Sequence, residues 1–309
     1  MRPHWVLGGA VAAAGIGIAL RTEHGRRRNA WTPPRGTFVD GPLHARVLGH
    51  TGQPVILLHG LLGSGAFWGG AYDRLADHGV LVVPDLLGFG RSPKPPSGYS
   101  LMDHVAAVEA LLDRIGVTEP AVIGAHSLGG LIAVGLAARS PARVSAIVAF
   151  GPPLYASHAD ARRAIAGLGA LARLTAIDSP LGRAACAWMC NHRAAAARLS
   201  QFTHPSLPAV VAQDAVQHTW ASYSNTMQNV ILAANIAGSL QDLDVPIHFI
   251  AGDSDRVVDL DLLRCIADRR NNMTLDIWPG RHDLPITQPE RCCAAIAASL
   301  PSVTSDRSA

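Results

Sequence analysis

The chain has 309 residues, of which 49% are hydrophobic and 16% are charged. This length allows one large domain or two small ones, and the apolar fraction is sufficient for a sizeable buried core. The formal net charge is only +3, and outside the N-terminus no basic block is interleaved with aromatic residues, so we expect no nucleic-acid partner.

The five cysteines do not form a recognisable framework. Cys186 and Cys190 are one helical turn apart, and no pair has the C-x-x-C spacing. The odd number of cysteines argues against a disulfide scaffold, and small buried thiols are the expected role. We expect neither a metal site nor a cofactor.

The N-terminal segment is apolar, because Trp5 to Leu20 carries no charge. It is somewhat shorter than the ~20 residues of a typical membrane-spanning helix. Arg21 and three further arginines follow it, whereas a cleaved signal peptide carries its positive charge before the apolar core. We therefore expect residues 1–21 to be a membrane anchor, residues 22–35 a linker, and the catalytic domain to be cytoplasmic. The alternatives are an export signal and a disordered leader.

From residue 36 onward, strand-like runs alternate with helical stretches, which predicts a mostly parallel sheet with helices on both faces. The expected strands are, in chain order, an antiparallel pair at Thr37–Val39 and Leu43–Leu48, followed by buried strands at Val55–Leu58, Val80–Pro84, Ala121–Ile123, Val144–Phe150, 246–252 and Met273–Trp278. A helix is expected from Ser100 to Ile115, because Ser100 and Asp103 resemble a capping box and Gly116 follows.

The alternation of strands and helices breaks between Phe150 and Pro246. This stretch is rich in Ala, Leu and Arg, and we expect residues 152–244 to form a helical lid over a core made of 36–151 and 245–303. Trp188, Trp220 and Met227 are candidates for the wall of an apolar acyl or alcohol pocket. The alternative is that these side chains form the lid's own core.

Ser127 is the candidate nucleophile. The apolar run Val122-Ile123 enters its segment and a helical stretch leaves it, while Ala125 and Gly129 flank it two positions away. Small flanking residues are needed where a strained strand-to-helix turn exposes a serine hydroxyl. The alternative is an ordinary turn whose serine caps the helix.

Backbone amides are the expected donors to an oxyanion. Gly60, which follows the strand Val55–Leu58, lets the backbone bend close to Ser127. The amides of Leu61 and Leu128 are then the natural pair of donors. A phosphate-binding loop is the alternative, but this stretch has neither the Walker lysine nor a G-x-G-x-x-G order.

A serine hydroxyl needs a base and an acid that orients the base. His282 is the candidate base, because it follows the last strand and a Pro-Gly turn. Either Asp253 or Asp255 could orient it, since both follow the strand that ends at Gly252. Asp255 is preferred, because an aspartate directly after a strand often caps the turn.

The order Ser127, Asp255, His282 resembles that of the α/β-hydrolase family, in particular its lid-containing branch of serine esterases and lipases. The resemblance covers most of residues 36–300. It is carried by His59-Gly60, the stretch from Asp85 to Ser92, Ala125 to Gly130, Gly252 to Asp255, and His282. Arg281 departs from it, because many members have glycine there. The resemblance implies a scaffold role for Asp85 and Ser92.

The function expected from these residues is cleavage of a carboxylic ester, or a related acyl bond, of an apolar small molecule through an acyl-enzyme. The partner is then a small-molecule ester, with membrane association through the N-terminal segment. The alternatives within the fold are a C–C bond hydrolase, a cofactor-free haloperoxidase and an acyltransferase. Outside enzyme chemistry, the alternative is a binding protein that retains the fold.

Overall fold

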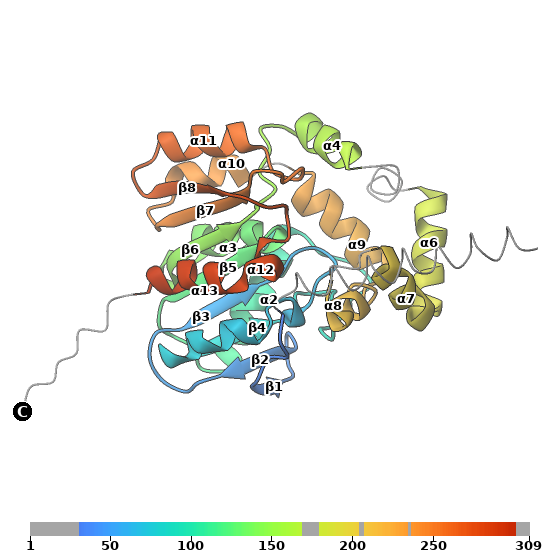
Figure 1. Ribbon diagram of the computed structural model, residues 1–309, viewed down its shortest axis with the longest axis horizontal. Coiled ribbons are helices and arrows are strands. Elements are labelled where there is room, and N and C mark those ends of the chain that lie inside the picture. The colour runs from blue at the N-terminus through green and yellow to red at the C-terminus, as the bar shows by residue number, and fades with distance from the viewer. Residues whose placement is uncertain (1–30, 169–178, 204–206, 234–235, 301–309) are drawn as a thin grey trace, which may run out of the picture.

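The computed structural model describes residues 31–168, 179–203, 207–233 and 236–300, and an eight-stranded sheet runs through its centre (Figure 1). The strand order is β1-β2-β4-β3-β5-β6-β7-β8. The strands are β1 (Thr37–Val39), β2 (Ala45–Leu48), β3 (Val55–Leu58), β4 (Leu81–Pro84), β5 (Ala121–His126), β6 (Val144–Phe150), β7 (Ile247–Gly252) and β8 (Met273–Trp278). From β4 through β3 to β8 the strands are parallel, whereas β2 is antiparallel to both β1 and β4. The predicted fold is confirmed.

Both faces of the sheet are covered, because side chains alternate along each strand. Ile56 and Leu58 of β3 point into one hydrophobic core, and Val55 and Leu57 point into the other. The first core includes α2 (Leu101–Arg114), α3 (Leu128–Arg139) and α11 (Leu260–Asp268). The second includes the 3₁₀ segment Gly70–Asp77, α12 (Leu284–Thr287) and α13 (Pro289–Ala298).

Local sequence features set the ends of α2, and pairing with β6 sets the end of β5. Ser100 and Asp103 form the expected capping box, which begins α2, and Gly116 takes a left-handed φ of +71° just after that helix. β5 is longer than the predicted strand, because residues 124–126 also pair with β6. The strand therefore runs up to His126, directly before Ser127.

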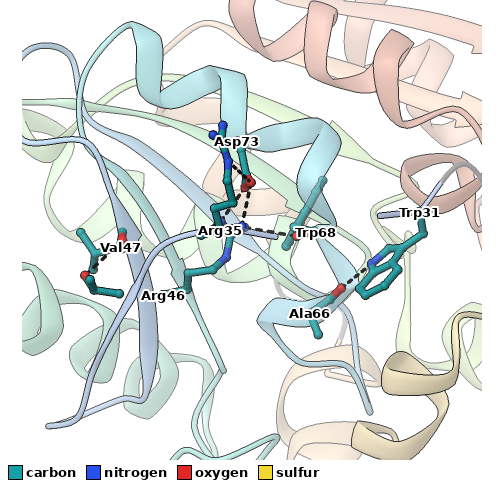
Figure 2. Close-up of polar contacts among 8 residues, drawn as sticks. Trp31, Arg35, Arg46, Val47, Ala66, Trp68 and Asp73 are labelled. Carbon is teal, nitrogen blue, oxygen red and sulfur yellow. Dashed lines mark hydrogen bonds and ion pairs between the residues drawn. The ribbon is translucent and has the colours of Figure 1, made fainter. Parts of the chain in front are cut away.

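The first described residues are bound to the edge of the core, as Figure 2 shows. Trp31 Nε1 donates to the Ala66 carbonyl at 2.8 Å, and the Arg35 N–H donates to Asp73 Oδ2 at 2.8 Å. Arg46 reaches the other oxygen of Asp73 at 2.7 Å, and both side chains are 4% exposed. Removing either partner would leave a buried charge, which is strongly unfavourable. Residues 31–35, the end of the expected linker, thus lie against the core.

Between β6 and β7 the chain leaves the sheet and forms mainly helices, most of which lie beyond one end of the sheet in Figure 1. They are α4 (His158–Gly167), α6 (Pro180–Asn191), α7 (Arg193–Thr203), α8 (Ala209–Asp214), α9 (Trp220–Thr226), a π-helical turn (Met227–Ile231) and α10 (Ile236–Ser239). The last of them, α10, lies against α3 instead. Ser64, in the loop after β3, donates to Asp214 of α8 at 2.6 Å. This bond ties α8 to the loop at the carboxyl end of β3.

The predicted membrane-associated localisation is corrected by the structure. Within the described residues, no helix has both the length and the apolar character that a membrane crossing requires. The apolar segment of residues 1–21, on which the prediction depended, lies outside the described residues.

Candidate active site

Ser127 occupies a strained turn between β5 and α3. Its φ is +52° and its ψ is −118°, a region that residues other than glycine rarely enter. Its N–H donates to the Phe150 carbonyl, and its carbonyl accepts from the Gly130 N–H, both at 2.9 Å. Ser127 stands at the N-cap position of α3, but its side chain makes no capping hydrogen bond. The hydroxyl is therefore not used as a helix cap.

Glycines make room for this turn. A Cβ atom on Gly129 would lie 2.4 Å from the Leu58 carbonyl oxygen. A Cβ atom on Gly60 would lie 3.1 Å from Ser127 Cβ and 2.9 Å from His126 Nδ1. Such approaches are closer than packed atoms allow, so both positions favour glycine. The loop after β3 thus passes directly beside the serine.

His282 and Asp255 form a close pair. They follow β8 and β7, which are neighbouring parallel strands, so both lie at the same edge of the sheet. His282 Nδ1 is 2.8 Å from Asp255 Oδ2, and only 1% of the Asp255 side chain is exposed. The Val257 N–H donates to the second carboxylate oxygen at 2.9 Å. Because a carboxylate only accepts, Nδ1 carries the proton and His282 Nε2 remains able to accept one.

Asp253, the alternative candidate, contacts other groups than His282. Its Oδ1 accepts from the Gly280 N–H at 3.1 Å and from the Ser254 hydroxyl at 3.0 Å. These bonds, that of Gly280 first, hold the pKa of Asp253 below its usual value. Asp253 therefore ties the loop after β7 to the loop after β8, and Asp255 is the partner of His282.

Gly151 places the Asp255–His282 pair beside the Ser127 turn. It follows Phe150, whose carbonyl accepts from Ser127, and its φ is +58°. A Cβ atom here would lie 3.0 Å from Asp255 Oδ2 and 3.1 Å from His282 Nδ1. Sequence reasoning missed Gly151, for which the only signal was a small residue after a strand.

The amides of Leu61 and Leu128 belong to the two segments that meet at Ser127. Leu128 is the first residue of α3, whose first N–H groups have no intrahelical acceptor. Leu61 follows Gly60, and Leu62 beside it takes a φ of +60°. Among the turn and loop hydrogen bonds of the described residues, neither amide donates to a backbone carbonyl.

Two buried histidines, His59 and His126, each precede a predicted site segment but were not among the predicted site residues. His59 donates from Nδ1 to the Gly60 carbonyl at 2.7 Å and accepts from the Leu86 N–H at 2.8 Å, and burial lowers its pKa. His126 donates from Nε2 to the His282 carbonyl at 2.8 Å. The only sequence signal for a role in the site was that each histidine lies at or directly after the end of a strand, just before a predicted site segment.

Of the three candidate pocket residues, Trp220 and Met227 share the first hydrophobic core, whereas Trp188 is exposed. Trp188 is 44% exposed and stacks on His192 with ring centroids 5.3 Å apart. Met227 is buried in the first hydrophobic core, and Trp220 packs against that core while partly exposed. Within the described ranges, no three His, Cys, Asp or Glu side chains are grouped as metal ligands would be.

The sequence is similar to a known protein family and to individual curated proteins. The family model of the alpha/beta hydrolase fold matches residues 53–289. The Arabidopsis thaliana protein named "Probable lysophospholipase BODYGUARD 4" is 30% identical over 253 residues, which cover 71% of this chain and 59% of the relative. The chain thus spans less than two thirds of that relative's length.

Two solved structures show the same arrangement of elements. E-2-(acetamidomethylene)succinate hydrolase has a TM-score of 0.67 at 21% identity, covering 85% of this chain and 98% of that one. An esterase from a Rhodococcus species has a TM-score of 0.60 at 25% identity, covering 83% and 93%.

Proposed function

The chain belongs to the α/β hydrolase fold family, and from this premise we propose that it is a serine hydrolase that cleaves a carboxylic ester of an apolar small molecule. The observation that carries the proposal is the Asp255–His282 hydrogen bond of 2.8 Å at the edge of the sheet where Ser127 stands on its strained turn. Such a trio is the arrangement that activates a serine hydroxyl.

In the proposed reaction, Ser127 Oγ attacks the ester carbonyl carbon while His282 Nε2 takes the hydroxyl proton. The carbonyl electron pair moves onto its oxygen, and the amides of Leu61 and Leu128 stabilise the resulting oxyanion. When the C–O bond to the alcohol breaks, the alcohol leaves with the proton from His282. Water then attacks the acyl-Ser127 with His282 as the base, which releases the acid and restores the serine.

The role of Asp255 in this reaction is to hold His282 in one tautomer and to stabilise the imidazolium that forms. Its position suits this role, because its other oxygen is fixed by the Val257 N–H and its side chain is buried. The carboxylate therefore cannot turn away from His282 without losing a second hydrogen bond.

Two observations support an apolar substrate: the apolar side chains near the carboxyl ends of the strands, and the names of the similar proteins. Residues 152–244 would form a lid, and its partly exposed Trp220 packs beside the first core. The names of the relatives include a lysophospholipase and an esterase. An ester with an acyl chain longer than acetate follows as the proposed substrate class.

The proposal is tested by offering the full chain p-nitrophenyl esters from acetate to palmitate. We expect saturable release of p-nitrophenol, with the highest kcat/KM for a chain longer than acetate, because each buried methylene contributes about 0.8 kcal/mol. Trp220→Ala should then shift the preferred chain length, whereas the exposed Trp188→Ala should not.

An absence of turnover with every ester would contradict the proposed substrate class. A best substrate of acetate in both the wild-type protein and Trp220→Ala would contradict the apolar pocket but not the serine chemistry.

A further inference from the structure

His126 lies where two parts of the proposed machinery meet. It is the last residue of β5, so the next residue along the chain is Ser127. Its Nε2 donates a hydrogen bond to the main-chain carbonyl of His282, which is 156 positions away in the sequence. A single residue is thus joined covalently to the proposed nucleophile and by a hydrogen bond to the main chain of the proposed base.

The His126 ring contacts two other rings. It stacks on Phe67 with centroids 4.6 Å apart and planes 19° apart. The His282 ring lies near it as well, with centroids 4.7 Å apart. Phe67 ends the 3₁₀ segment Gly65–Phe67, in the loop after β3 that also carries Leu61. His126 is only 6% exposed, so its ring has little freedom to move.

The surroundings of the His126 ring favour its uncharged form. Burial, and then the proximity of His282, lowers the pKa of His126 well below its usual value. A carbonyl only accepts, so the proton is on Nε2, and His126 Nδ1 has no hydrogen-bond partner among the described residues. Neutrality matters because His282 becomes positive when it takes the serine proton, and a second cation beside it would oppose that step.

From this geometry we propose that His126 is a positioning residue that keeps the His282 imidazole within reach of Ser127, a role that rests on the proposed function. Asp255 holds the His282 ring through Nδ1, whereas His126 holds the main chain that carries the ring. Loss of the hydrogen bond from His126 to the His282 carbonyl would let the His282 ring shift relative to Ser127. A displacement of about 1 Å can lower a rate by roughly 100-fold.

The test compares His126→Phe with His126→Gln in the full chain. Phenylalanine keeps the ring that stacks on Phe67 but cannot donate, whereas the glutamine Nε2 amide can donate from about the same distance along the side chain. On the best p-nitrophenyl ester we expect His126→Phe to lower kcat by about 100-fold with KM changed less than about threefold, and His126→Gln to recover most of the rate.

Equal losses in the two variants, or a wild-type kcat in His126→Phe, would overturn the proposal. Thermal unfolding checks that both variants fold; if His126→Phe does not, His126→Asn replaces it, since its amide reaches only the Nδ1 position and should show the same loss. Failure of the proposed function itself is distinguishable, because the wild-type protein would then show no turnover that depends on Ser127.

Discussion

Ser127→Ala is expected to lower kcat for ester hydrolysis by about 10⁴-fold or more, because no other group can form the acyl-enzyme at this turn. KM should change little, since the alanine removes only the hydroxyl. The fold should persist, because the Ser127 N–H and carbonyl, rather than its side chain, hold the turn to Phe150 and Gly130. Initial rates on the best p-nitrophenyl ester measure the effect.

The matched control for this variant is Ser254→Ala. Ser254 lies in the loop after β7, next to the aspartates, and its hydroxyl contacts only Asp253 among the described residues. We expect it to keep the wild-type kcat. Turnover that survives in Ser127→Ala, measured in protein whose thermal unfolding is unchanged, would contradict the assignment of the nucleophile.

Asp255→Asn is expected to lower kcat by about 10⁴-fold, because an amide nitrogen facing His282 Nδ1 would favour the wrong tautomer of the base. The effect should be large because the Asp255 side chain is only 1% exposed, so water has little access to accept the Nδ1 proton of His282 instead. The rate is measured near neutral pH and again at higher pH, where hydroxide can partly replace the base.

Asp253→Asn is the matched control for Asp255→Asn. The asparagine carbonyl can still accept from the Gly280 N–H, so the contact between the two loops remains possible. We expect kcat within about threefold of the wild-type value, because Asp253 has no hydrogen bond to His282 among the described residues and a surface substitution changes stability little. A larger loss in Asp253→Asn than in Asp255→Asn would exchange the roles of the two aspartates.

The sequence predicted the sheet and the Ser127 turn because their signals are local. The β-branched pair Val122-Ile123 and the small residues Ala125 and Gly129 specify a buried strand followed by a tight turn, and both are found. By contrast, Asp253 and Asp255 are two positions apart in one turn. Which of them faces His282 depends on how the loops after β7 and β8 pack, and residue types do not encode that packing.

Other features depend on contacts between distant segments. His126 looks like an ordinary strand residue in the sequence, and its bond to the His282 carbonyl appears only when β5 and the loop after β8 meet. The apolar character of Trp188 predicts a place in a pocket wall, and no signal in the sequence indicates that α6 leaves this side chain 44% exposed. Helix orientation in a segment rich in alanine is set by few large side chains, so the pattern gives little guidance.

The most direct test of the account is to treat the full chain with a fluorophosphonate and to locate the adduct by mass spectrometry. An activated serine displaces fluoride and forms a stable O–P bond, whereas an ordinary serine reacts negligibly. We expect one equivalent of label, on the peptide that contains Ser127, with labelling that is strongly slowed in His282→Ala. Folded protein that takes up no label, or that is labelled at another residue, would contradict the claim that Ser127 is the nucleophile.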